Sequence, residues 1–481
     1  MIENDSRDDL QEDLQADLQE DGHDEPAERG KLRGAGVSGR AAKTRALVIG
    51  PYLSDRAAAY ANGERTMRSH EARLLEAEGL ALAINVELVG GELILLSQIK
   101  PATFLGKGKV EDIAARVKDE EIDLVVVDCA LSPVQQRNLE KAFGAKVIDR
   151  TGLILEIFGE RARTREGALQ VELAHLTYQK SRLVRSWTHL ERQRGGFGFL
   201  GGPGETQIET DRRLIQERMT RIERDLEGVK KTRGLHRKSR RDVPFPIVAL
   251  VGYTNAGKST LFNKMTNADV FAKDLLFATL DPTLRGLKLP HGGRIILSDT
   301  VGFISELPTM LVSAFRATLE EVLEADVILH VRDIAHEDAD AQGADVAKIL
   351  GELGVDAQDH DRLIEVWNKL DALDENERER VQNSAARRPE DERPSVVSAL
   401  TGEGIDGLLQ AIETRLARGR LLLSVPLDAA DGEGQAWLHA HTEVLAREMD
   451  EEGAPAFQVR IAPEGLERLR RRFPQAMEIG A

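Results

Sequence analysis

The sequence of 481 residues predicts a multidomain α/β protein. In two separate stretches, apolar strand-like runs alternate with amphipathic helical patterns, and a stretch with a heptad pattern lies between them. A chain of this length is also too long for a single hydrophobic core, so several domains are expected. We therefore expect an N-terminal α/β subdomain with a helical hairpin, a second α/β domain, and a small C-terminal α+β domain.

The chain begins with a segment for which we expect no fixed structure. Residues 1–28 carry twelve acidic residues and one arginine, and no sustained apolar period appears before residue 45. Residues 1–44 are therefore predicted to be a disordered acidic tail. This N-terminus also lacks the basic and apolar regions of a secretory signal, and no apolar run reaches the roughly 18 residues of a membrane span. With Cys129 as its only cysteine, the chain is expected to be a cytoplasmic monomer without stable membrane insertion.

Residues 45–158 are expected to form the N-terminal α/β subdomain. Helical patterns in this stretch include EARLLEAEG (71–79) and VQQRNLEKAF (134–143). They alternate with four strand-like runs, which are RALVIG (45–50), ALAINVEL (81–88), IDLVVVD (122–128) and AKVIDR (145–150). Such alternation is typical of β-α-β units and predicts a largely parallel sheet.

Residues 159–241 are expected to form a basic helical hairpin. Two heptad runs are separated by a glycine-rich interruption, the first with Leu169, Leu173, Leu176, Leu183, Trp187 and Leu190, the second with Ile208, Ile215, Met219, Ile222, Leu226 and Val229. Two heptad helices joined by a loop are typical of an antiparallel hairpin. Residues 161–241 hold twenty Lys and Arg against ten Asp and Glu, although the chain has a net charge of −17. A basic segment inside an acidic chain favours nucleic acid as a partner.

Residues 242–416 are expected to form the second α/β domain, which opens with a phosphate-binding loop. GYTNAGKS follows the apolar strand IVALVG and precedes a helical run, the context that the G-x-x-x-x-G-K-[ST] pattern requires. Lys258 would supply charge at the β and γ oxygens of a nucleotide, and the Ser259 hydroxyl would reach Mg²⁺. The expected nucleotide-binding residues are Gly252, Tyr253, Thr254, Asn255, Ala256, Gly257, Lys258 and Ser259.

Three later motifs predict that the nucleotide is GTP. In DTVG, Asp299 would hold Mg²⁺ through its water shell, and Gly302 would donate its backbone N–H to the γ-phosphate. In NKLD, the Asp371 carboxylate would accept the two donors of guanine, a pattern that adenine does not present. SAL would support the guanine oxygen through its backbone. The residues concerned are Asp299, Thr300, Val301, Gly302, Asn368, Lys369, Leu370, Asp371, Ser398, Ala399 and Leu400.

The segment between these motifs, FATLDPTLR (277–285), is expected to be switch I. From the residues alone, either Thr279 or Thr283 qualifies as the ligand that completes the Mg²⁺ shell. The expected nucleotide contacts here are Phe277, Ala278, Thr279, Leu280 and Asp281. Phe303 stands where many GTPases have a glutamine that orients the attacking water, so another group must do this work.

With these motifs, the chain resembles the HflX family of ribosome-associated GTPases. GYTNAGKST, FATLDPT, DTVGFI and NKLD look like the GTPase motifs of that family, and GPGETQIETDRR (202–213) looks like the signature of its N-terminal region. The resemblance covers about residues 45–420 and implies a P-loop GTPase domain, with Thr279 as the magnesium ligand of switch I. It also implies binding to the large ribosomal subunit, with its rRNA and proteins, and the splitting or rescue of stalled ribosomes under stress. Gly201 and Leu284 depart from the family, which commonly has a basic residue and a threonine there.

Asn255 suggests how the site would work without a glutamine. Similar GTPases use an asparagine at this position to ligate a potassium ion that bridges the phosphates, which would make Lys258, Asn255 and Gly302 the catalytic residues. The alternative interpretation is that Asn255 stabilises the loop through local hydrogen bonds. A ribosomal surface that orders the switches is a second activator, compatible with the first.

The hairpin tip RQRGGFGFLGGPGETQ (192–207) is expected to contact RNA. Aromatic rings at the tip can stack on unpaired bases, and nearby arginines can meet phosphates. The expected RNA-binding residues are Arg192, Arg194, Phe197, Phe199, Arg212 and Arg213. The alternative is a flexible turn with a solvated basic face.

Residues 417–481 are expected to form the small α+β domain. LLLSVPL (421–427) and FQVRIAP (457–463) are strand-like, and GQAWLHAHTEVLAREMDEEG (434–453) has a helical pattern. For the whole chain, two alternatives to a ribosome-rescue GTPase stay open. One is a ribosome-assembly GTPase, and the other is a non-catalytic adaptor whose fold is only stabilised by nucleotide.

Overall fold

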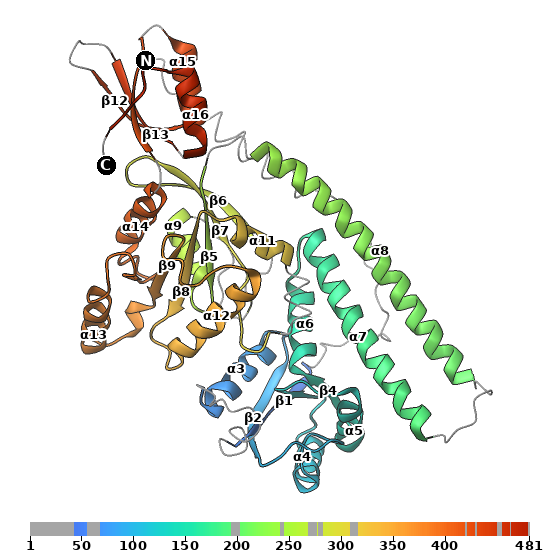
Figure 1. Ribbon diagram of the computed structural model, residues 1–481. Helices are drawn as coiled ribbons and strands as arrows, with labels where there is room; N and C mark the ends of the chain where they lie inside the picture. Colours follow the sequence, from blue (N-terminus) through green and yellow to red (C-terminus); the bar gives the residue numbers. More distant parts are fainter. Residues whose placement is uncertain are drawn as a thin grey trace. The chain divides into compact units, whose positions relative to one another are not determined.

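The computed structural model describes residues 43–54, 68–193, 203–240, 245–267, 277, 282–307, 316–418, 421–428, 431–449, 455–461 and 463–479. These ranges contain a four-stranded parallel sheet, a pair of long helices, a six-stranded sheet and a four-stranded antiparallel sheet (Figure 1). The α/β multidomain class predicted from the sequence is therefore confirmed. Nearly all of the predicted acidic tail lies outside the described residues.

The N-terminal sheet is entirely parallel, with the strand order β2-β1-β3-β4. Its strands are β1 (Arg45–Leu53), β2 (Glu87–Leu96), β3 (Leu124–Val127) and β4 (Lys146–Asp149). One face is covered by α3 (His70–Leu82) and α6 (Arg150–Arg161), the other by α4 (Lys107–Asp119) and α5 (Pro133–Phe143). The central strands are buried on both faces, as expected for a parallel sheet between helical layers.

The strand predicted over residues 81–88 is wrong in its position. Residues 81 and 82 are the last two of α3, and the strand β2 begins only at Glu87. Ala77, Leu80 and Ala81 are fully buried, so the apolar residues continue the buried face of the helix at helical spacing. A short apolar run does not by itself distinguish a buried helix from a strand, which explains the error.

The two long helices α7 (Arg165–Gln193) and α8 (Pro203–Arg240) lie side by side (Figure 1). They are antiparallel, because Arg218 donates two hydrogen bonds of 2.7 and 2.8 Å to Glu172, while Lys180, further along α7, bonds Gln216, which precedes Arg218 on α8. The glycine-rich segment between the helices lies outside the described residues.

The heptad pattern describes the packing of α8 better than that of α7. Met219, Ile222 and Leu226 of the predicted pattern are buried. Among the described residues of α7, however, the buried apolar side chains are Val171 and Ala174, which belong to the core of the N-terminal subdomain, whereas the predicted Leu169, Leu173, Leu176 and Leu183 are only half-buried. The reason is that α7 packs on two sides, against α8 and against α6.

The six-stranded sheet has the order β10-β9-β8-β5-β7-β6, and all neighbours are parallel except β6 and β7. Its strands are β5 (Ile247–Gly252), β6 (Thr283–Lys288), β7 (Arg294–Asp299), β8 (Val327–Asp333), β9 (Leu363–Asn368) and β10 (Ser395–Val396). On one face pack α9 (Lys258–Thr266) and α14 (Ile405–Ala417), and on the other α11 (Arg316–Glu324) and α12 (Ala339–Leu353). The short helix η2 (Leu370–Ala372) and α13 (Glu375–Ala386) connect β9 to β10.

One continuous hydrophobic cluster joins the N-terminal sheet and the six-stranded sheet. It extends from Val48 and Leu153 of the N-terminal subdomain to Val251 and Leu319 around the six-stranded sheet. Phe158 of α6 meets Phe277 edge to face, with 4.7 Å between the ring centres, and both rings are buried. Such a pair stabilises by about 0.5–1.5 kcal/mol beyond its buried area, so the two layers are packed as neighbouring parts of one core.

The C-terminal sheet is antiparallel, with the order β12-β13-β11-β14 and its own hydrophobic cluster. Its elements are β11 (Leu421–Pro426), α15 (Gly432–His441), β12 (Glu443–Met449), β13 (Pro455–Ile461), α16 (Pro463–Arg472) and β14 (Met477–Glu478). The helix predicted over residues 434–453 is therefore wrong in its second half. Thr442 is extended, and the next residues pair with β13, so sheet pairing overrides the helical propensity of LAREM. In the part of the chain that is described, no helix is long and apolar enough to cross a membrane.

Candidate nucleotide site

The predicted nucleotide motifs meet at one edge of the six-stranded sheet. Gly252 is the last residue of β5, Asp299 the last of β7 and Asn368 the last of β9. Ser398 follows β10 by two residues. The carboxyl ends of parallel strands lie at the same edge, which is where α/β folds bind their ligands. The topology thus brings together four motifs that lie far apart in the sequence.

Two glycines of the P-loop are required by close approaches of other backbone and side-chain groups. A Cβ on Gly252 would lie 2.2 Å from the carbonyl oxygen of Val331, and one on Gly257, which has a φ of +89°, would lie 2.3 Å from Asn368 Nδ2. The Asn368 amide donates to the carbonyl of Ala256 at 2.8 Å. Only glycine fits these two positions, so the loop keeps its shape through its contact with NKLD.

Lys258 is positioned as a phosphate ligand. Its ammonium donates to the carbonyl oxygens of Gly252 at 3.1 Å and Tyr253 at 2.9 Å. An ammonium has three protons, so these bonds account for two of them and fix the direction of the third. Burial lowers the pKa of Lys258 to about 8, although Asp299 acts in the opposite direction. A bound triphosphate would favour the charged form again, because its negative charge compensates the lost hydration.

Ser259 and Asp299 form the oxygen cluster in which a metal ion fits. The Ser259 hydroxyl donates to the fully buried Asp299 carboxylate at 2.7 Å. Hydroxyl and carboxylate oxygens are the ligands that Mg²⁺ prefers, and the ion usually keeps several waters. When bound with a nucleotide, it would neutralise charge that develops on the phosphates. The expected third protein ligand, Thr279, lies outside the described residues, as do Ala278, Leu280 and Asp281.

The residues expected to read the base are linked by hydrogen bonds. The Ser398 hydroxyl donates to the Asp371 carboxylate, and the Ala399 N–H donates to the side chain of Asn368 at 2.9 Å. Lys369 has a left-handed φ of +67° and forms an ion pair of 2.8 Å with Asp333. These contacts hold the Asp371 carboxylate in one direction, as a base-reading group requires.

Four other predicted ligands have mainly structural surroundings. Leu370 and Val301 are buried, and the Thr300 hydroxyl donates to the carbonyl of Leu250 at 2.5 Å. Leu400, by contrast, is 71% exposed. Contact of Leu370, Val301 and Thr300 with nucleotide would therefore have to be made mainly by backbone atoms.

Phe303 is held against the P-loop by its backbone, while its ring lies in the hydrophobic core. The Thr254 N–H donates to the Phe303 carbonyl at 2.7 Å, and the Phe303 N–H donates to the Gly252 carbonyl at 3.0 Å. The residue is only 1% exposed and belongs to the cluster that joins the two sheets. Its side chain therefore packs away from solvent and offers no polar group to a water molecule.

Asn255 lies at the surface of the P-loop, with its backbone in the left-handed region at a φ of +61°. Asparagine tolerates this conformation better than most residues. Among the residues described, no hydrogen bond of its side chain is found, so the local bonding considered in the sequence analysis is not seen there. The exposed amide is accessible to a ligand.

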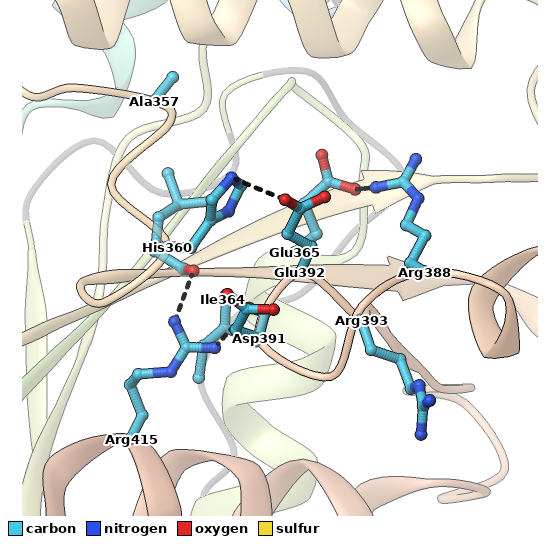
Figure 2. A pocket seen from close by; sticks show the side chains of 10 residues that line it. Ala357, His360, Ile364, Glu365, Arg388, Asp391, Glu392, Arg393 and Arg415 are labelled. Carbon is cyan, nitrogen blue, oxygen red and sulfur yellow. Dashed lines mark hydrogen bonds and ion pairs between the residues drawn. The ribbon is translucent and has the colours of Figure 1, made fainter. Parts of the chain in front are cut away.

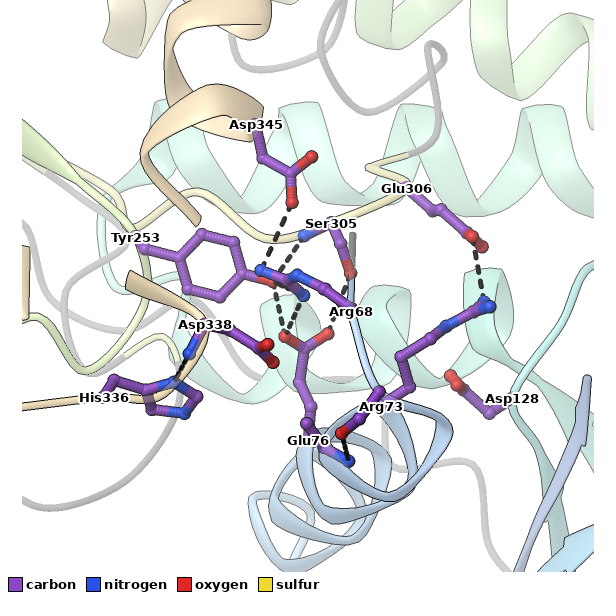
Figure 3. Close-up of polar contacts among 12 residues, drawn as sticks. Arg68, Arg73, Glu76, Asp128, Tyr253, Ser305, Glu306, His336, Asp338 and Asp345 are labelled. Atoms are coloured by element: carbon purple, nitrogen blue, oxygen red, sulfur yellow. Dashed lines mark hydrogen bonds and ion pairs between the residues drawn. The ribbon is translucent and has the colours of Figure 1, made fainter. Parts of the chain in front are cut away.

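A polar network that the sequence did not predict connects this site with the N-terminal sheet (Figure 3). Glu76 of α3 lies at its centre and accepts hydrogen bonds from Arg68, Arg150, Ser305 and the hydroxyl of Tyr253. Tyr253 belongs to the P-loop, and Ser305 follows DTVGF by two residues. The N-terminal subdomain therefore contacts both the phosphate loop and the segment that senses the γ-phosphate.

The charges in this network are fixed by their neighbours. Burial alone would raise the pKa of Glu76, but Arg150, the Tyr253 hydroxyl and Arg68 outweigh it and lower that pKa. Burial and the nearby carboxylate of Glu76 both raise the pKa of Tyr253, so its hydroxyl keeps its proton. For Arg150, burial is outweighed by Asp128 and Glu76, which raise its pKa. Glu76 is thus an anion, Arg150 a cation, and Tyr253 a neutral donor.

A hollow lies at the opposite, amino end of β9 (Figure 2). Its charged groups have partners within the protein: Glu365 pairs with Arg388 at 3.2 Å, and Arg415 donates to the carbonyl of Asp391 at 3.0 Å. None of the predicted site residues lines it. We assign it no part in nucleotide binding.

The predicted RNA-binding residues are only partly visible. Arg212 and Arg213 are exposed on α8, and Arg213 forms an ion pair of 3.7 Å with Glu217 on the same helix. Arg192 is the last residue but one of α7, with its side chain undescribed, and Arg194, Phe197 and Phe199 lie outside the described residues.

Family models match four successive parts of the chain. They are described as "GTP-binding GTPase N-terminal" (residues 71–159), "GTP-binding GTPase Middle Region" (161–240), "50S ribosome-binding GTPase" (247–369) and "HflX C-terminal domain" (384–479). The chain is 51% identical to GTPase HflX of Magnetococcus marinus over 393 residues, 81% of this chain and 88% of that protein. It is 46% identical to GTPase HflX of Escherichia coli K12 over 380 residues, 79% of this chain and 87% of that protein.

The chain belongs to the HflX family of GTPases. Membership and the arrangement of the motifs establish GTP hydrolysis as its activity and GTP and GDP as its nucleotides. A GTPase of this fold binds magnesium together with its nucleotide, which agrees with the oxygen cluster at Ser259 and Asp299. A solved GTP-binding protein of Sulfolobus solfataricus in complex with GDP is 22% identical, with a TM-score of 0.41 over 78% of this chain and 99% of that one, too low a likeness to support an argument.

Proposed function

We propose that this HflX-family GTPase is a switch that binds the large ribosomal subunit in the cytoplasm and splits or rescues stalled ribosomes under stress. It would act as a monomer, binding in its GTP form and leaving after hydrolysis. In such a switch, the γ-phosphate and Mg²⁺ order two segments that are released when GTP is cleaved. The proposal requires a physical connection between those segments and the surface that meets the ribosome.

The contact between Phe158 and Phe277 carries this proposal. Phe277 opens the predicted switch I, and Phe158 lies near the end of α6, which is followed by α7 after three residues. The long hairpin of α7 and α8 is therefore joined to switch I through the buried ring of Phe158 and a short connecting segment. A rearrangement of switch I on hydrolysis would change the packing of Phe158 and reach the hairpin directly.

The exposed face of α8 supports RNA as the ribosomal contact. Arg212, Arg213, Arg221 and Arg224 are all exposed on this helix. Arginines on one helix can bind several phosphates at once, and such binding weakens as salt rises because counterions are released. We propose that these residues and the hairpin tip, with Arg192, Arg194, Phe197 and Phe199, contact ribosomal RNA.

For hydrolysis, we propose that Lys258 and the Gly302 N–H stabilise the γ-phosphate and that Ser259, Thr279 and, through water, Asp299 hold Mg²⁺. The exposed amide of Asn255 would ligate a potassium ion beside the phosphates. Such an ion would supply the positive charge that an arginine finger supplies in other GTPases. Turnover should then be higher in potassium than in sodium buffer, and Asn255→Ala should remove the difference. Equal turnover in both salts would favour a purely structural Asn255.

The central test is binding of the full-length protein to purified large subunits and to intact ribosomes, with GDP and with a non-hydrolysable GTP analogue. We expect tight binding only with the analogue, together with dissociation of intact ribosomes followed by light scattering. Arg212→Ala/Arg213→Ala should weaken binding, whereas the matched pair Arg380→Ala/Arg387→Ala, also exposed but on α13 and at its C-cap, should not. Equal affinity with GDP and the analogue would contradict the switch.

The same experiment separates the alternatives. A ribosome-assembly GTPase would bind precursor subunits and leave intact ribosomes undivided. A non-catalytic adaptor would keep its cellular function in the Lys258→Ala variant, although that variant no longer hydrolyses GTP. Loss of function in Lys258→Ala, with binding to the subunit retained, would exclude the adaptor.

A further inference from the structure

We call the segment DTVGF and the residues directly after it switch II. In this protein, the position that often holds a water-orienting glutamine is Phe303, so switch II cannot act through that side chain. Phe303 is buried, so the backbone around Gly302 is what this segment presents to the phosphate site. A Cβ on Gly302 would lie 3.1 Å from Lys258 Nζ and 2.9 Å from Thr254 Cγ2. The segment therefore lies in close contact with the P-loop, and catalysis depends on how firmly its backbone is held there.

The turn that follows, Ser305–Glu306, anchors this segment on the N-terminal side. Glu306 has a left-handed φ of +52°, which costs a residue with a Cβ about 1–2 kcal/mol. Hydrogen bonds from the N-terminal subdomain offset this strain. Arg150 donates to the carbonyl and the hydroxyl of Ser305 at 3.0 and 3.1 Å, and Arg73 pairs with Glu306 at 3.0 Å.

The hydroxyl of Tyr253 connects this turn to the P-loop. It accepts the backbone N–H of Ser305 at 2.8 Å and Arg68 Nη1 at 2.9 Å, and it donates to Glu76. A phenol has one proton and two acceptor positions, so all its hydrogen-bonding capacity is used. Figure 3 shows these groups converging on one point from α3, the P-loop and the turn.

Glu76 is satisfied in the same complete way. One carboxylate oxygen accepts from Arg150 at 2.6 Å and from the Ser305 hydroxyl at 3.0 Å, and the other accepts from Arg68 at 3.0 Å and from Tyr253. Because the Glu76 carboxylate and the Tyr253 hydroxyl both have their hydrogen-bonding positions occupied, the network favours a single arrangement of these two groups. The phosphate loop, switch II and α3 are therefore fixed relative to one another by two side chains.

We propose that Tyr253 is a positioning residue for GTP hydrolysis, held in place by Glu76 of the N-terminal subdomain. Its hydroxyl fixes the backbone of Ser305, and through it Gly302 beside Lys258. The hydroxyl does not itself reach the phosphate, because the Tyr253 group that contacts Lys258 is the backbone carbonyl, at 2.9 Å. Its effect is therefore on the rate of the chemical step and not on nucleotide affinity.

The test is Tyr253→Phe in the full-length protein, which removes one oxygen and keeps the ring. Hydrolysis is followed under single-turnover conditions with Mg²⁺, and GTP affinity is titrated separately. We expect a rate about tenfold lower, the size expected for one hydrogen bond of a charged network, with GTP affinity unchanged. An unchanged or higher rate overturns the proposal. So does an equal loss of rate and affinity, which would indicate a merely structural role.

Glu76→Gln provides the second variant, and the pair forms a double-mutant cycle. If Glu76 acts through Tyr253, the double variant loses no more rate than the stronger single variant, whereas independent effects would multiply and overturn the coupling. Glu92→Gln is the matched control, since Glu92 is a carboxylate of the same subdomain that pairs with Lys109 at 2.5 Å and Arg116 at 3.3 Å. Its rate should equal that of the unaltered protein. Thermal unfolding of all variants separates loss of fold from loss of rate.

Discussion

The N-terminal sheet and the six-stranded sheet both have charged residues at their carboxyl edges, but the partners of these residues differ. At the carboxyl edge of the six-stranded sheet, Lys258, Asp299 and Asn368 surround a place for a charged ligand. At the carboxyl edge of the N-terminal sheet, Asp128 and Arg150 also follow the ends of strands, and they pair at 2.5 Å. There the space is taken by a turn of the protein itself. One edge carries the predicted nucleotide motifs, and the other holds the turn that follows DTVGF.

The difference between the two edges shows where a buried charge stabilises the fold and where it does not. In the N-terminal edge, each buried charge has partners of opposite sign, so folding keeps the ionised forms. In the nucleotide site, burial disfavours the charge of Lys258 until a phosphate arrives, so the folded protein is less stable than it would be without that charge. Substitutions at the two edges should therefore have opposite consequences for stability and activity.

The largest effect on stability is expected for Arg150→Leu. The change leaves the carboxylates of Asp128 and Glu76 buried without their cation, which typically costs about 3–5 kcal/mol. The measurement is urea unfolding of the full-length protein. Arg116→Leu is the control, because Arg116 is about a third exposed and should cost about 1 kcal/mol or less. Similar losses in both variants would contradict the comparison.

Lys258→Ala should lower GTP turnover without lowering the stability of the fold. GTP turnover should fall about a hundred- to a thousandfold, because a charge at the reacting phosphates is lost. The free energy of unfolding without nucleotide should not fall, since a poorly solvated ammonium has been removed. Turnover assays and unfolding on the same preparations test both expectations. A variant as unstable as Arg150→Leu would show that Lys258 stabilises the fold after all.

Nucleotide affinity should fall as pH rises through about 8. A bound phosphate raises the pKa of Lys258 above its value of about 8 in the free protein. Binding therefore takes up a proton above that pH, and affinity should be about tenfold weaker near pH 9 than near pH 7. Titration with GDP at several pH values measures this. Lys258→Arg should give a flat profile because arginine stays charged, and a flat profile for the unaltered protein would refute the assignment.

The smallest effect is expected where the two sheets share their core. Phe158→Leu keeps an apolar side chain of similar size but removes the edge-to-face contact with Phe277, at a cost of about 1 kcal/mol. It should also alter turnover, because it touches switch I. Phe143→Leu, in the core on the other face of the N-terminal sheet, should cost similar stability without changing turnover. If both variants hydrolyse GTP normally, the aromatic contact does not reach the site.

The residues at the nucleotide edge could be predicted from the sequence because they belong to short motifs. GYTNAGKS, DTVG, NKLD and SAL each combine several residue types at fixed spacing, and their order along the chain matches the order in which the fold requires them. The N-terminal edge has no such motif. Glu76 lies in an ordinary amphipathic helix, and only the fold brings it within reach of Tyr253 and Ser305.

The sequence nevertheless contained a weak indication of the charged N-terminal edge. Asp128 is the last residue of the strand-like run IDLVVVD, and Arg150 is the last residue of AKVIDR, so two charges stood at the ends of predicted parallel strands. The sequence misplaces the start of β2 and predicts a helix where β12 lies for a different reason. There, packing of α3 and pairing with β13 decided the structure, and both involve partners that a local pattern does not contain.

The hydrophobic cluster that joins the N-terminal sheet and the six-stranded sheet also limits which parts of this protein can evolve separately. The C-terminal domain has its own core, including Leu423, Phe457 and Phe473, and can be exchanged or lost in evolution without opening the core of its neighbours. The N-terminal subdomain has no such independence. Without it, Phe277 and Phe303 would become exposed aromatic surface beside the phosphate site. The two parallel sheets therefore have to evolve, and to be expressed, as a single unit.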